Sequence, residues 1–214
     1  ERHRGASIVV AGEFQPPIVH ALAHWLTEHL GNVGQTVSYA ATAEVVPTRK
    51  LQSLSELVEE MKHGTVEALT ILGGNPAYAT PGDLNFARHL SEVKCSIHLG
   101  LEIDETALAS TWHIPQSHYL ESWGDARAFD GTVSLLQPLI APLYNGKTAC
   151  ELLGAFTQQQ PVRDGYEIVS QFWKRQGRCD DFEHGWRPAL HDGFIAGTQT
   201  APVHPRVQDG FDRQ

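Results

Sequence analysis

The sequence predicts an α/β fold: a doubly wound, mostly parallel sheet with helices on both faces and an irregular aromatic and proline-rich extension. Two observations favour this class. Short apolar runs recur in the first half of the chain and tend to end in glycines, and stretches with helical periodicity and capping residues separate them. Strands that alternate with helices in this way are typical of parallel sheets built from βαβ units.

The first βαβ unit is expected near the start of the chain. An apolar run at residues 7–11 predicts a buried strand. Residues 16–30 have helical periodicity, with prolines where a first turn tolerates them and Gly31 as a C-cap. A second strand is expected over residues 36–40.

The next elements lead to a glycine turn. A helix is expected over residues 53–63, where Ser53 and Glu56 form a capping box and Gly64 ends the helix. A third strand over 66–72 ends in the turn Gly73-Gly74-Asn75-Pro76. Beyond the turn we expect a helix over 82–90, a strand over 95–99 and a short helical piece over 106–110.

The pattern changes after residue 110. Residues 112–146 are expected to form an ordered, irregular extension that wraps the sheet, and residues 147–195 to be mostly helical. Capping boxes begin helices at Thr148 and Asp164, and a last helix is expected over 182–190. The extension carries five aromatic residues, which we expect to pack and to contact another subunit: Trp112, Tyr119, Trp123, Phe129 and Tyr144.

The domain organisation expected is one α/β domain over residues 1–200 and a flexible tail over 201–214. Both ends resemble cut edges, because an apolar strand pattern begins at residue 7 and the polar tail has no periodicity. We therefore expect the chain to be a fragment of a larger protein.

Composition excludes several classes of function. The formal net charge of −9 argues against nucleic-acid binding through phosphates. No apolar run is long enough to cross a bilayer, so no direct membrane insertion is expected. The sequence contains three cysteines, which are Cys95, Cys150 and Cys179. They follow no metal-ligand spacing, so no metal site is expected.

The histidines give two weak metal signals. His20 and His24 are spaced i, i+4, but no glutamate completes an HExxH motif, so ordinary helix or interface roles are favoured. His113 and His118 flank Pro115 in a loop, where structural hydrogen bonding or a subunit interface is favoured.

A candidate site follows from the sheet itself. Ligands of parallel sheets lie beyond the carboxyl ends of the strands, so residues 12–17, 73–81 and 100–106 should share one edge. At the Gly73–Pro76 turn the glycines would let a ligand approach the backbone, although a tight turn without a ligand is an equal alternative. Asp104 is expected to cap the following helix, and Glu105 to add favourable negative charge in its first turn. The alternative is that a carboxylate here hydrogen-bonds to a sugar or base hydroxyl of a ligand.

The residues around this turn also resemble a known family. Residues 71–78 (ILGGNPAY), 81–86 (PGDLNF) and 103–106 (IDET) resemble the molybdopterin oxidoreductase superfamily, as do His113-Ile114-Pro115 and residues 130–134. Residues 112–115, 119–125, 137–144 and 186–193 are more closely similar to the molybdopterin-like iron–sulfur subunit of bacterial alternative complex III. Together these motifs cover most of residues 7–195.

The resemblance implies a place in a respiratory complex that oxidises quinol and passes electrons to a cytochrome or oxidase, on the periplasmic side of the bacterial inner membrane. It implies other domains of the same chain and membrane-complex subunits as partners, and iron–sulfur clusters elsewhere in the full-length chain. The family's domain cradles one nucleotide arm of molybdopterin guanine dinucleotide. The residues that would carry this role are Gly73, Gly74, Asn75, Pro76, Glu105 and Thr106.

Departures from the family pattern favour a scaffold without bound molybdenum cofactor. The chain lacks the cysteine-rich iron–sulfur segment, and residues 135–138 (LLQP) lack the arginine of the family's corresponding stretch. The fragment alone is expected to catalyse nothing. Two alternatives stay open: a nucleotide-arm-binding domain of an active molybdopterin enzyme, and a stand-alone small-molecule-binding α/β protein.

Overall fold

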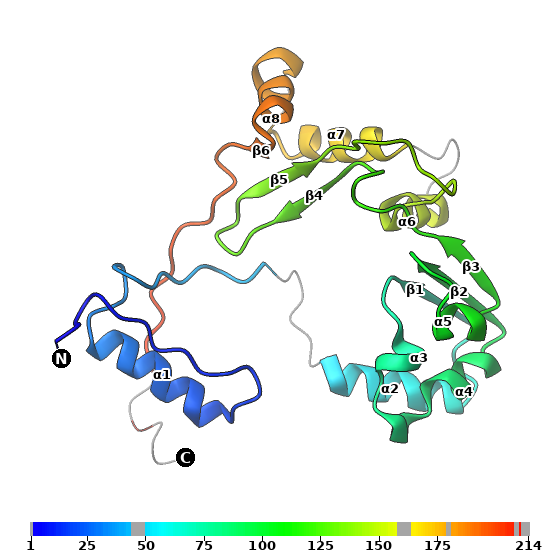
Figure 1. The fold of residues 1–214 in the computed structure, drawn as a ribbon, viewed down its shortest axis with the longest axis horizontal. Helices are drawn as coiled ribbons and strands as arrows, with labels where there is room; N and C mark the ends of the chain where they lie inside the picture. Colours follow the sequence, from blue (N-terminus) through cyan, green and yellow to red (C-terminus); the bar gives the residue numbers. More distant parts are fainter. Residues whose placement is uncertain (1, 44–49, 158–163, 179–180, 208–209, 211–214) are drawn as a thin grey trace. The chain divides into compact units, whose positions relative to one another are not determined.

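The computed structural model describes residues 2–43, 50–157, 164–178, 181–207 and 210. The chain divides into two compact units, whose elements are labelled in Figure 1. Unit 1 consists of Glu1–Ala43, Arg127–Thr132 and Ala196–Gln214, and unit 2 of Glu44–Ala126 and Val133–Ile195.

Unit 2 contains a parallel three-stranded sheet, so the chain has an α/β fold. The strands β1 (Ala68–Leu72), β2 (Cys95–Gly100) and β3 (Trp112–Pro115) lie in the order β1-β2-β3. The strands predicted over 66–72 and 95–99 are confirmed. β3 lies in the segment expected to be irregular, because four residues ending in proline carry no strand pattern and only pairing with β2 makes them a strand.

The helices near this sheet differ in part from the prediction. They are α2 (Lys50–Lys62), α3 (Pro76–Ala79), η1 (Gly82–Leu84), α4 (Phe86–Glu92) and α5 (Glu105–Ala109). Ser53 lies inside α2, so the predicted capping box is wrong. The single helix predicted over 82–90 is also wrong: Asn85 adopts a left-handed φ of 48°, which asparagine tolerates, and separates η1 from α4.

One hydrophobic cluster joins these helices to β1. Val58 of α2 and Leu90 of α4 are fully buried at its centre, with Phe86 beside them. Leu69 and Ile71, which share one face of β1, pack against the cluster. Burial of each large side chain stabilises the fold by about 1.5–3 kcal/mol, so this face of the sheet is firmly covered.

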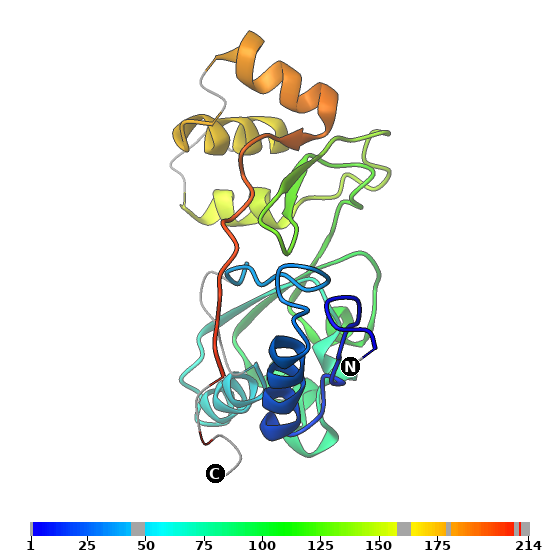
Figure 2. The same cartoon turned by 90° about the vertical axis from the view of Figure 1, so that its left-hand side faces the viewer.

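A second sheet involves the later part of unit 2. Its strands are β4 (Gly124–Arg127), β5 (Val133–Leu136) and β6 (Phe194–Ile195), in that order, with β5 and β6 antiparallel. Figures 1 and 2 show it beside the C-terminal helices of unit 2. These helices are α6 (Ala149–Thr157), α7 (Gly165–Arg175), η2 (Phe182–Trp186) and α8 (Arg187–Asp192).

The helix starts predicted at Thr148 and Asp164 are confirmed, whereas the single helix predicted over 182–190 is divided into η2 and α8. The Glu151 N–H donates to Thr148 Oγ1 (3.1 Å) and the Thr148 N–H donates to Glu151 Oε2 (2.8 Å), which is a complete capping box for α6. Asp164 caps α7 by accepting from the Glu167 N–H (2.8 Å). Gly193, with a φ of 77°, follows α8 as its predicted exit.

The aromatic side chains of the extension are mostly exposed. Trp123 is half-buried and packs edge-on against Tyr166, at 4.9 Å between ring centroids. The prediction that the other four aromatic side chains pack within the chain is wrong, because each of them is at least 60% exposed. They are Trp112, Tyr119, Phe129 and Tyr144. Their contact with another subunit stays a prediction.

Unit 1 is built around α1 (Pro17–His29), which begins and ends as predicted, with Gly31 at a φ of 67° after it. The two strands predicted around it are wrong. Residues 7–11 are irregular, with Val10 82% exposed, and residues 36–40 form only isolated bridges, from Val37 to Val33 and from Tyr39 to Val203. An apolar run becomes a strand only where a partner supplies a ladder. Nowhere in the described ranges is a helix long and apolar enough to cross a membrane.

Candidate functional site

The predicted glycine turn lies at the carboxyl edge of the parallel sheet. Gly73 and Gly74 follow β1 with φ values of 74° and 73°, in the left-handed region that glycine enters most easily. The Gly73 N–H donates to the Leu99 carbonyl (2.8 Å), which ties the turn to β2. The backbone conformation therefore requires these two glycines whether or not a ligand is present.

Asn75, Glu105 and Thr106 form one hydrogen-bonded network beside this turn. Asn75 Nδ2 donates to Glu105 Oε2 (2.6 Å), and Thr106 Oγ1 donates to Asn75 Oδ1 (2.8 Å). Thr106 is fully buried, while Glu105 is exposed. Residues 30 positions apart in sequence thus meet at the place where the sheet topology predicts a site.

The first backbone donors of α3 are engaged by the chain itself. Pro76 has no N–H, the Ala77 N–H donates to Thr106 Oγ1 (3.0 Å), and the Tyr78 N–H donates to the Asn75 carbonyl (3.1 Å). The N-terminus of a helix binds anions through such donors. A phosphate at α3 would have to displace these internal bonds.

Carboxylates dominate the charge around the turn. The hydrogen bond from Asn75 is the main cause that lowers the pKa of Glu105, so this carboxylate stays ionised. Asp104 caps α5 by accepting from the Ala107 N–H (2.9 Å), which is the structural role predicted for it. No lysine or arginine side chain in the described ranges hydrogen-bonds to the turn.

The structure adds one buried residue that sequence reasoning missed. His98 of β2 is fully buried, and its Nε2 donates to the Gly74 carbonyl (3.0 Å). Its Nδ1 lies 3.3 Å from Nδ1 of His113, so the two imidazole rings share a hydrogen bond. The signal was available, because an imidazole inside a predicted buried strand must find polar partners.

The two imidazoles lie against a glycine and a carboxylate. A methyl group on Gly100 would overlap the His98 ring, so glycine allows this ring to lie close to its own strand. Asp104 Oδ1 is 3.8 Å from His98 Nδ1. Burial, and next the proximity of His98, lower the pKa of His113.

The six residues that the resemblance implies for a nucleotide arm are thus brought together. The segment 73–81 and the segment 100–106 share one edge, as predicted, whereas residues 12–17 belong to unit 1. His118 accepts from the Leu120 N–H, as expected of a structural residue. The described residues contain no group of three or more potential metal ligands, and Cys179 lies outside them.

No family model matches the chain, and a search of curated proteins finds no match.

Proposed function

We propose that this chain is a scaffold domain of a molybdopterin oxidoreductase-like subunit in a respiratory electron-transfer complex, where it holds no molybdenum cofactor. The complex would oxidise quinol and reduce a cytochrome or oxidase on the periplasmic side of the bacterial inner membrane. The resemblance at residues 71–86 and 103–106 supports the family. A doubly wound sheet, with helices on both faces, is part of this proposal.

The observation that carries the scaffold role is the internal pairing at the turn. The groups that would contact a nucleotide instead bond to one another: Asn75 to Glu105 and to Thr106, and Thr106 to the start of α3. A ligand gains little from polar groups that must first break such bonds. The network stabilises the turn without a ligand.

The charge at the turn also favours the scaffold role. A dinucleotide brings a pyrophosphate, which needs cationic side chains or free backbone donors. The turn offers the ionised Glu105 carboxylate and a four-residue helix whose first donors are engaged. These residues do not fit the pyrophosphate of a molybdopterin dinucleotide.

A second candidate keeps some support. The exposed Gly74 backbone and the exposed Glu105 carboxylate lie together at the carboxyl edge of the sheet, where a guanine or ribose could approach. This geometry favours a nucleotide-arm-binding domain of an active molybdopterin enzyme.

Calorimetric titration of the chain with GDP separates the two candidates. The scaffold role predicts that GDP does not bind with a Kd below about 1 mM, which corresponds to a binding free energy of about −4.1 kcal/mol. Asn75→Ala should leave the titration unchanged, with Gln176→Ala at an exposed position as the control. Binding that is tighter than this and is lost in Asn75→Ala would favour the nucleotide-arm domain instead.

A second experiment tests the place in a complex. The native polypeptide is captured from detergent-solubilised membranes, and quinol:cytochrome oxidoreductase activity and molybdenum and tungsten content are measured. The proposal predicts that quinol oxidation co-purifies with the polypeptide and that neither metal is stoichiometric. Stoichiometric molybdenum or tungsten contradicts the scaffold role, and the absence of quinol oxidation contradicts the place in the complex.

A further inference from the structure

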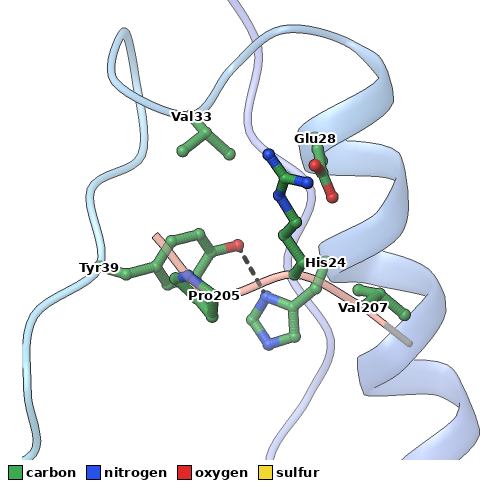
Figure 3. Close-up of a pocket in the computed structure, with 7 residues that line it drawn as sticks. His24, Glu28, Val33, Tyr39, Pro205 and Val207 are labelled. Carbon is green, nitrogen blue, oxygen red and sulfur yellow. Dashed lines mark hydrogen bonds between the residues drawn. The ribbon is translucent and has the colours of Figure 1, made fainter. Parts of the chain in front are cut away.

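Unit 1 contains a pocket that is separate from the turn site. Its volume is about 270 Å³, and Figure 3 shows the residues that line it. Drug-sized ligands occupy pockets of about 300–1,000 Å³, so this one suits a smaller molecule. The lining residues are His24, Glu28, Val33, Tyr39, Pro205, Arg206 and Val207.

Three segments of unit 1 place these residues. His24 and Glu28 are four residues apart on α1 and therefore share one face of the helix. The loop after α1 is held by Asn32, which is fully buried and bonds to Ser7. The Val203 N–H donates to the Tyr39 carbonyl (2.9 Å), and this bond brings the following C-terminal residues to the pocket.

His24 and Tyr39 form the polar wall. Their Nδ1 and hydroxyl atoms are 2.9 Å apart. Burial, and next the negative charge of Glu28, raise the pKa of Tyr39, so the phenol keeps its proton. The Tyr39 hydroxyl and the His24 ring therefore form one hydrogen-bonded pair on this wall.

The pocket also presents one negative and one positive side chain. In the part of the chain that the structure describes, no ion pair joins Glu28 to Arg206, or either of them to another residue. A carboxylate ligand alone would bring its charge next to Glu28, and an amine alone would bring its charge next to Arg206. A molecule with both charges satisfies both side chains.

We propose that this pocket binds a free α-amino acid with an apolar side chain. The ammonium group bonds to Glu28, the carboxylate bonds to the Arg206 guanidinium, and the side chain contacts the apolar surface of Val33, Pro205 and Val207. The proposal goes beyond the scaffold role and does not depend on it, because the pocket lies in unit 1 and the turn in unit 2.

Calorimetric titration at pH 7.5 with L-leucine, isoamylamine and 4-methylpentanoate tests the pairing of charges. The three probes share the same branched end and differ in their charged groups. We expect one molecule of leucine to bind per chain, at least tenfold more tightly than either singly charged probe. Equal or tighter binding of either of these, or no binding of leucine, overturns the proposal.

Two variants locate the binding. Glu28→Gln and Arg206→Gln should each weaken leucine binding at least tenfold, because each removes one charge-assisted contact, whereas Glu13→Gln on the exposed surface of the same unit should not. In Glu28→Gln the preference for leucine over 4-methylpentanoate should shrink, which mere loss of folding cannot produce. Unchanged leucine binding in both pocket variants overturns the proposal.

Discussion

At the scale of single residues, the turn site depends on one buried hydroxyl. Thr106 Oγ1 accepts from the Ala77 N–H and donates to Asn75 Oδ1, so it joins α5 to the start of α3. Thr106→Val keeps the shape and removes both bonds, and it should lower the free energy of unfolding by about 1–3 kcal/mol. Thr106→Ser keeps the hydroxyl and should lose only about 0.8 kcal/mol. Urea unfolding measures both, and a valine variant as stable as the serine variant would contradict the role.

The imidazole pair makes the fold sensitive to acid. Burial and His98 lower the pKa of His113 in the folded chain below its ordinary value of 6.5. As the pH falls through this value, His113 therefore takes up a proton in the unfolded chain before it does so in the folded chain. The free energy of unfolding decreases as a result. Above this pH both states are neutral and the contribution is constant. Asp104, which faces the pair, opposes the shift only in part.

His113→Asn tests this, since it removes the titrating group and keeps a hydrogen-bond donor. Between pH 8 and pH 5 the unfolding free energy should fall less in this variant than in the unmodified chain. His191→Asn, at a side chain that is 87% exposed, should leave the slope unchanged. Equal slopes for all three proteins would refute the assignment.

At the scale of elements, the predictions succeeded where local chemistry decides the structure. The capping box of α6 and the Asp164 cap of α7 were predicted because side chains three residues apart satisfy the orphan donors of a first turn. The same motif failed at Ser53, where α2 extends further toward its N-terminus and needs no cap at that position. A capping motif therefore predicts a helix more safely than it predicts the first residue.

The α6 box yields a quantitative prediction. Thr148→Ala removes the acceptor of the Glu151 N–H and should cost about 0.5–2 kcal/mol of unfolding free energy. Thr148→Ser keeps the box and should cost little. Thermal and urea unfolding of the two variants give the difference, and an alanine variant that matches wild type would show that the bond contributes nothing.

At the scale of the whole molecule, three large apolar side chains that are close in sequence are exposed. Leu139, Leu143 and Tyr144 lie within six residues of one another and are 68–79% exposed. Where exposed apolar side chains form a patch, they mark contact surfaces or drive self-association. We therefore expect the isolated chain to self-associate at micromolar concentration.

Sedimentation velocity checks this expectation. Replacement of Leu139, Leu143 and Tyr144 by serine should shift the chain toward the monomer, whereas serine at the exposed polar residues Lys174, Arg175 and Gln176 should not. A wild-type chain that stays monomeric at high concentration would contradict the expectation.

The sequence by itself determined the α/β class, two of the three parallel strands, the glycine turn and the capped starts of α6 and α7. Each of these depends on contacts between near neighbours in the chain: a strand pattern with a turn, or a cap with its helix. Tertiary structure alone decided that residues 112–115 form the third strand, that residues 7–11 form none, and that His98 joins Gly74 to His113. Strand pairing and buried polar contacts join distant residues, and an apolar or polar side chain does not encode which distant partner it meets.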